Sequence, residues 1–119
     1  MIMQVLSPST SLWDQQTLFV VQPPGVRPAV GRWSPLTDEG WTLVFPRWET
    51  PADLRGQIED CRKRGLDRSR FVIVGLSDAG PLAVRLAQEV GVPCVQASGE
   101  DAPDVIAQRA LKTIPPAYG

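Results

Sequence analysis

The stretch FVIVGLSDAGPLAVRLAQEVGVPCVQA, residues 71–97, restricts the fold more than any other part of the chain. Its first run, Phe71–Leu76, is almost wholly apolar, which is typical of a strand that is covered on both faces. A polar turn follows, and then a segment with apolar residues at helical spacing that ends at Gly91. The next run, Pro93–Gln96, is predicted to be a short strand. Two strands joined by one helix form a βαβ unit, so at least part of the sheet is predicted to be parallel.

Three further strands are predicted in the first half of the chain. They are Thr17–Gln22, Val26–Trp33 and Trp41–Phe45, and turn residues separate them. Pro28 lies within the second of these strands and cannot donate a hydrogen bond to a neighbouring strand, which favours an edge position. We expect the three strands to form an antiparallel meander.

Two further helices are predicted, one before and one after the βαβ unit. Thr50 can cap the first of them through its hydroxyl, and Pro51 suits the first helical position. The apolar stripe of this helix consists of Leu54, Ile58 and Cys61. The last helix begins near Ala102. Its residues available for burial are Val105, Ile106, Ala110 and Leu111.

These elements follow one another in the order β-β-β-α-β-α-β-α. The predicted fold class is therefore α/β: a single small domain, residues 1–119, whose mixed sheet joins an N-terminal antiparallel meander to a C-terminal βαβ unit. Residues 1–16 and 115–119 are candidate flexible ends. A domain of this size buries roughly two-thirds of the surface of its unfolded chain, so a hydrophobic core is expected.

The chain has 119 residues, a formal charge of −1 and no histidine. Without histidine there is no Ser-His-Asp or Cys-His catalytic set, and the commonest zinc ligand is missing. An enzyme is therefore disfavoured, and we expect no metal site and no cofactor. The two cysteines, Cys61 and Cys94, lie in a predicted helix and a predicted strand, which favours buried, reduced thiols.

No apolar run approaches the roughly 20 residues of a membrane span. The first residues, MIMQVLSPSTSLWDQQ, lack the positive start and the apolar stretch of a signal peptide. The nearly neutral net charge predicts no general attraction to nucleic acid or to a membrane surface. We therefore expect a cytoplasmic protein that does not contact the membrane.

The turn between the strand Phe71–Leu76 and the following helix is a candidate anion-binding site. A helix start presents unpaired amides and the positive end of the helix dipole, and glycine allows a ligand to approach closely. The candidate ligand-binding residues are Gly75, Ser77, Asp78, Ala79 and Gly80, with Arg47 or Arg70 as counter-charges.

The same turn departs from the strong motifs of its kind. It is neither GxGxxG nor a P-loop, since it lacks the P-loop lysine. A nucleophile elbow has Gly-x-Ser-x-Gly, whereas Ala79 stands at the last position here, and the chain has no histidine to activate Ser77. The alternative to a ligand site is that Ser77 or Asp78 only caps the helix.

Part of this region, Val72–Pro93, resembles the pyrophosphate-loop region of phosphoribosyltransferases, in which a strand ending in Gly is followed by a turn, a helix and Gly-Val-Pro. That family also has an acidic ribose-phosphate loop after a further strand. Gly99-Glu100-Asp101 is acidic, but it lacks the hydrophobic lead and the Thr-Gly of that loop. Transferase activity is therefore not expected.

A second resemblance covers about residues 18–77. The segments concerned are Phe19-Val20-Val21-Gln22-Pro23, Gly40-Trp41-Thr42-Leu43-Val44-Phe45, the helix from Pro51, and Phe71–Ser77. In this order they resemble the N-terminal module of SseB-like proteins. Pro46-Arg47 stands where that family has Thr-Ser, and its later Asn-Pro-Gly is absent. The resemblance implies a module without a known enzymatic role, which is typical of that family, and some of its members act as accessory or regulatory proteins.

A basic segment follows the first predicted long helix. Its cations are Arg62, Lys63, Arg64, Arg68 and Arg70. Cations are favoured at the end of a helix by its dipole, and here they can also pair with Glu59 and Asp60. The alternatives are contact with the phosphates of a nucleic acid or with an acidic protein partner.

Four tryptophans lie in the first half of the chain. Trp33 and Trp48 are candidate interface residues, because tryptophan is enriched at protein interfaces. The alternatives are burial in the core, and stacking of bases on indoles beside Arg32 and Arg47.

The leading functional hypothesis is a small cytoplasmic non-enzymatic domain for protein interaction or an accessory role, acting as a homodimer or with a protein partner. The first alternative is a phosphate- or nucleotide-binding domain that uses the turn Ser77–Gly80. The second alternative is a nucleic-acid accessory protein that uses the basic segment Arg62–Arg70.

Overall fold

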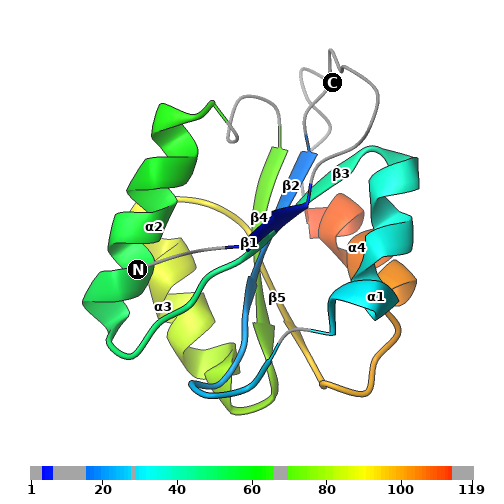
Figure 1. Ribbon diagram of the computed structural model, residues 1–119. Helices are drawn as coiled ribbons and strands as arrows, with labels where there is room; N and C mark the ends of the chain where they lie inside the picture. The colour runs from blue at the N-terminus through cyan, green and yellow to red at the C-terminus, as the bar shows by residue number, and fades with distance from the viewer. Residues whose placement is uncertain (1–3, 7–15, 28, 66–69, 114–119) are drawn as a thin grey trace.

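The computed structural model describes residues 4–6, 16–27, 29–65 and 70–113, which are built around a five-stranded mixed sheet (Figure 1). Its strands are β1 (Gln4–Leu6), β2 (Gln16–Val21), β3 (Trp41–Phe45), β4 (Arg70–Leu76) and β5 (Cys94–Ala97). They lie in the order β1-β3-β2-β4-β5. All neighbours are parallel except β1 and β3, which are antiparallel. The predicted α/β class and mixed sheet are therefore confirmed.

The predicted C-terminal βαβ unit is also confirmed. Helix α3 (Gly80–Val90) connects β4 to β5, and a short 3₁₀ helix, Ser77–Ala79, leads into it. Strands β4 and β5 pair in parallel, with Ile73 opposite Cys94. Gly91 ends α3 in the left-handed conformation, with a φ of 76°, as expected of a glycine that follows a helix.

The connection between β2 and β3 is helical, so the predicted strand Val26–Trp33 is wrong. Val30–Trp33 forms the short helix α1, and a 3₁₀ helix, Ser34–Glu39, continues it. Packing explains the difference, because helical turns direct both Trp33 and Leu36 into the core, where each is at most 3% exposed. Tertiary contacts of this kind override local strand propensity. Pro28, the predicted edge residue, lies outside the described residues.

The predicted antiparallel meander is wrong for the same reason. With a helical crossover between them, β2 and β3 are parallel neighbours. The antiparallel partner of β3 is β1, a strand that the sequence does not predict. Residues 1–3 and 7–15, which belong to the N-terminal end expected to be flexible, lie outside the described residues. Strand β2 begins at Gln16.

Helices cover both faces of the sheet (Figure 1). On one face, α1 and α4 (Pro103–Thr113) pack residues such as Trp33 and Ile106 against Leu18 of β2. On the other face, α2 (Pro51–Lys63) and α3 pack residues such as Ile58 against Phe19. Alternate residues of β2 therefore belong to different cores, as the pleat of a strand requires.

The details of the helices agree with the sequence in part. Thr50 and Asp53 form a capping box at the start of α2, and the stripe Leu54, Ile58 and Cys61 is buried, as predicted. Ile106 and Ala110 of α4 are buried too. The prediction is wrong for Val105 and Leu111, which are 42% and 41% exposed, because they lie on the outer side of α4.

The order of the four parallel strands indicates where a ligand would bind. The crossover from β2 to β3 runs over one face of the sheet, and the crossover from β3 to β4 runs over the other. The connections leaving the carboxyl ends of the neighbours β2 and β4 therefore go to opposite faces. In open α/β sheets, ligands bind outside the carboxyl ends of the strands near such a point.

Candidate functional site

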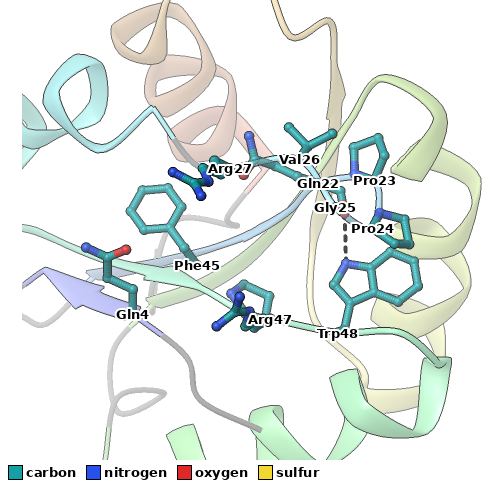
Figure 2. Close-up of a pocket in the computed structure, with 11 residues that line it drawn as sticks. Gln4, Gln22, Pro23, Pro24, Gly25, Val26, Arg27, Phe45, Arg47 and Trp48 are labelled. Carbon is teal, nitrogen blue, oxygen red and sulfur yellow. Dashed lines mark hydrogen bonds between the residues drawn. The ribbon is translucent and has the colours of Figure 1, made fainter.

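The loops that follow β2 and β3 enclose a pocket of about 310 Å³ (Figure 2). Because the two strands are parallel, their carboxyl ends meet at the same edge of the sheet. Gln4 reaches this edge from β1, where it is paired with Phe45. The described residues that line the pocket are Gln4, Gln22, Pro23, Pro24, Gly25, Val26, Arg27, Phe45, Pro46, Arg47 and Trp48.

Two guanidinium groups are the charged groups among the described lining residues of this pocket. Arg27 belongs to the loop after β2 and Arg47 to the loop after β3, and both residues are exposed. None of the described residues that line the pocket is acidic. Within the described residues, neither arginine has an ion-pair partner. The pocket therefore has the charge and the donor geometry that suit a carboxylate or phosphate.

The backbone of Arg47 is held by a buried glutamine of α2. Gln57 is only 3% exposed. Its Oε1 accepts a hydrogen bond from the Arg47 N–H at 3.1 Å, and its Nε2 donates to the Arg47 carbonyl at 2.7 Å and to the Asp53 carbonyl at 3.1 Å. One side chain thus fixes both polar groups of the Arg47 backbone. The backbone of Arg47 is therefore held in place by the fold itself.

Trp48 links the two loops of the pocket. Its Nε1 donates to the Gln22 carbonyl at 2.8 Å, the bond that is dashed in Figure 2. The residue is half-buried, and it packs against the core between the sheet and helices α2 and α3. The orientation of the indole is therefore fixed, and its ring forms part of the pocket wall.

The predicted anion-binding turn lies after the neighbouring strand β4, and none of its candidate residues lines the pocket. Its glycines have a packing role. A Cβ added to Gly75 would lie 2.6 Å from the Ala83 Cβ and 2.8 Å from the Gly80 Cα. A Cβ added to Gly80 would lie 2.8 Å from Oε1 of Gln96. Both residues are buried. The two glycines allow α3 to approach the sheet closely, and an added Cβ at either position would lie too near its neighbours.

Ser77 has a φ of 53°, the only positive φ among the described non-glycine residues. It is exposed, and its Oγ accepts a hydrogen bond from the Gly99 N–H at 3.3 Å. A positive φ at a serine on a strand–turn–helix connection is one feature that this turn shares with a nucleophile elbow. Ala79 is small and buried, so it does not disturb that geometry. The sequence does not predict the positive φ of Ser77, because no residue pattern indicates backbone strain at a serine.

Two features of the chain disfavour Ser77 as a nucleophile. The chain has no histidine that could act as its base. Val21 at the end of β2 is paired with Gly75, so the loop after β2 begins beside this turn. That loop continues with Pro23 and Pro24, which have no N–H to donate to an oxyanion. The observed arrangement therefore holds an exposed serine that no histidine can activate.

The basic segment lies away from both of these features. Arg62, Lys63 and Arg64 are exposed at the carboxyl end of α2, where the dipole favours them. Arg62 pairs with Glu59 at 3.3 Å and donates to the Val90 carbonyl at 3.2 Å. Arg68 lies outside the described residues. Arg70 is the first residue of β4, whereas the turn at Ser77 follows the last residue of that strand.

The tryptophans divide between core and surface. Trp33 and Trp41 are 3% and 2% exposed, so both belong to the core of the chain. Trp33 packs edge-on against Phe45, with 6.1 Å between ring centroids. Of the two candidate interface residues, only Trp48 keeps part of its surface exposed. Trp13 lies outside the described residues.

The remaining reactive groups offer little chemistry. Cys61 is buried, Cys94 is half-buried, and neither forms a disulfide bond. Burial raises the pKa of the Cys94 thiol to about 11, so it is protonated at neutral pH and is a poor nucleophile.

Within the described ranges, no group of three or more His, Cys, Asp or Glu residues could hold a metal ion. In the same ranges, no helix is long and apolar enough to span a membrane.

Comparisons with protein-family models, with curated proteins and with solved structures found no match to this chain. The resemblance to SseB-like proteins therefore stays a prediction. The geometry of the pocket is the basis on which a function can be argued.

Proposed function

We propose that this chain is a non-catalytic domain that binds a small anionic ligand between Arg27 and Arg47. The observation that carries the proposal is the pocket at the carboxyl edge of β2 and β3, which contains two guanidinium groups and no acidic residue among its described lining. Its volume of about 310 Å³ lies at the lower end of the range for small-molecule sites. The ligand is therefore small, and its charge complements that of the pocket.

The structure around the arginines favours binding in two ways. Gln57 holds the backbone of Arg47, and Trp48 joins the two loops through Gln22. Binding therefore costs less ordering of the loops than it would in an open, unlinked pocket. Each guanidinium can also donate two hydrogen bonds to one carboxylate or phosphate.

The non-catalytic part of the proposal is supported by the residues around Ser77. The chain has no histidine, and the loop beside Ser77 carries two prolines in place of oxyanion donors. The Arg27 and Arg47 pocket is favoured over the turn at Ser77 as the anion site, because Gly75 and Gly80 pack α3 against the sheet.

Calorimetric titration with inorganic phosphate and with citrate tests the proposal. The variants are Arg27→Gln and Arg47→Gln, and the matched control is Lys63→Gln, an exposed cation at the far end of α2. Loss of one charge-assisted contact, about 1.5–3 kcal/mol, weakens binding by tenfold or more in either arginine variant. The control binds as the unmodified chain does. Absence of binding at millimolar anion, or an equal loss in Lys63→Gln, would contradict the proposal.

Self-association and a cytoplasmic location, both expected from the sequence, stay predictions. The half-buried Trp48 is the interface candidate that retains exposed surface. Sedimentation of the intact chain at high micromolar concentration measures the first, with a dimer expected. A monomer under those conditions would count against it without affecting the anion site.

A further inference from the structure

The pocket has a second kind of surface besides its arginines. Most of its other described lining residues are apolar or aromatic. They are Pro23, Pro24, Val26, Phe45, Pro46 and Trp48. An inorganic ion would use only the arginine side of the pocket, because these residues have no side-chain donor available to a ligand. A ligand that fills the pocket therefore has an apolar part as well as a charge.

The aromatic part of the wall is rigid. The only polar group of the Trp48 side chain, Nε1, is already engaged by the Gln22 carbonyl at 2.8 Å. The indole therefore offers a ligand its ring surface and no hydrogen bond. Phe45 is only 4% exposed and is packed against Trp33. A fixed indole ring favours a ligand with a planar ring, because aromatic rings prefer offset-stacked or edge-to-face contact.

The charged and the apolar parts of the pocket are adjacent. Arg47 and Trp48 are consecutive residues, and both line the pocket. In the view of Figure 2, the arginine side chains lie on the side of Phe45 and Gln4, whereas Trp48 lies on the side of Pro23 and Pro24. A ligand with an anionic group at one end and a ring at the other matches this arrangement.

We propose that the ligand is an aromatic anion, a planar ring that carries a phosphate or carboxylate group. The ring lies against Trp48, and the anionic group lies between Arg27 and Arg47. This inference rests on the proposed function, because it assumes that the pocket binds anions. It adds the chemical class of the ligand and assigns Trp48 as the residue that selects it.

A series of phosphate monoesters separates the ring from the charge. Methyl phosphate, cyclohexyl phosphate and phenyl phosphate carry the same anionic group, and only the last has a planar ring. Calorimetric titration is expected to show that phenyl phosphate binds roughly fivefold or more tighter than methyl phosphate, the scale of one stacking contact, with cyclohexyl phosphate between them. Acetate and benzoate form a parallel pair, and the tighter of phenyl phosphate and benzoate identifies the preferred anionic group.

Two variants of Trp48 assign the preference to its ring. Trp48→Leu is expected to bind all three phosphates with the affinity of methyl phosphate. Trp48→Phe keeps a ring and loses the bond to Gln22, so it retains part of the preference. Arg47→Gln weakens all three esters by the same factor. Circular dichroism shows whether each variant folds, and the ester series on the unmodified chain decides the matter if Trp48→Leu does not.

The outcomes distinguish this inference from the proposed function. If the three esters bind equally well, or if cyclohexyl phosphate equals phenyl phosphate, the aromatic class is wrong and the anion site stands. If no ester binds at millimolar concentration, the anion site itself is wrong. A ring preference that persists in Trp48→Leu would overturn the role given to Trp48.

Discussion

Gln57 shows how one buried polar side chain can position a site that lies elsewhere in the sequence. It lies on α2 between Leu54 and Ile58, and its amide reaches the backbone of Arg47 in the loop before the helix. From the sequence it looks like an ordinary polar residue of an amphipathic helix, because nothing local reveals its burial. Buried amides of this kind are fully hydrogen-bonded, and removing one leaves its partners unsatisfied.

Gln57→Leu is expected to destabilise the fold by about 1–3 kcal/mol, because the Arg47 N–H and carbonyl lose their partners. It is also expected to weaken phosphate binding, because Arg47 is no longer held in place. Urea unfolding and calorimetric titration measure the two effects. Gln88→Leu, at an exposed position of α3, is the control and changes neither. Equal effects of the two substitutions on stability and on phosphate binding would show that Gln57 does not position Arg47.

Gly75 tests the close packing of α3 on β4, and Gly56 in α2 is the comparison. Gly75→Ala places a methyl group 2.6 Å from the Ala83 Cβ, and overpacking of this kind costs about 1–3 kcal/mol. Gly56→Ala in α2 has nothing within 4 Å of the new Cβ, and it is expected to stabilise by up to about 1 kcal/mol through helix propensity. Denaturant unfolding of both variants gives the comparison. A neutral Gly75→Ala would mean that the contact is looser than described.

At the scale of elements, the sequence predicts the features that depend on residues close together in the chain. It does not predict the features that depend on long-range contacts. The cap at Thr50 and the β4–α3–β5 unit were predicted, because each depends on residues close together in the chain. The helix α1 was not, since its burial depends on contacts with the sheet. The predicted meander would also have put a strand between β2 and β3. The sequence suggests Arg47 as a counter-charge. It does not predict that Arg47 shares a pocket with Arg27, because the meander would separate the loops after β2 and β3.

Two carboxylates tie α2 to its surroundings and link stability to pH. The pKa of Asp53 is lowered by hydrogen bonds from the backbone N–H groups of Glu49 and Thr50. The pKa of Glu89 on α3 is lowered by the hydrogen bonds from Arg55 on α2 and by its charge. Folding therefore favours the ionised form of both groups.

The stability that these carboxylates contribute is fully present above their ordinary pKa values of 3.8 and 4.5. It is lost as the pH falls through their lowered pKa values in the folded state. The urea midpoint is therefore expected to fall on acidification in that window, and less so in the double variant Asp53→Asn, Glu89→Gln. An identical acid profile in the unmodified chain and the double variant would contradict this assignment.

At the scale of the whole molecule, the topology collects at one edge of the sheet what the sequence scatters. The carboxyl ends of β2, β3 and β4 bring together Arg27, Arg47 and the turn at Ser77, while α2 carries the basic residues Arg62–Arg64 toward the opposite edge. The net charge of −1 gives no hint of a cationic pocket, because it averages over both edges. Only the strand order reveals which loops are neighbours.

The two thiols report on opening of the whole fold. Cys61 is buried, and the pKa of Cys94 is raised to about 11, so both are expected to react with a disulfide reagent at neutral pH far more slowly than free cysteine. In denaturant both react at once. Absorbance during labelling measures the rates. Rapid reaction of Cys94 in the native protein would mean that β5 is more open than the structure describes.

The location of the anion site can be tested directly by amide chemical-shift mapping with inorganic phosphate. We expect the shifted signals to come from Gly25–Arg27 and from Arg47–Trp48, the two segments that line the pocket, and to saturate with one affinity. Shifts confined to Ser77–Gly80 or to Arg62–Arg64, or no shifts at millimolar phosphate, would contradict the proposed site.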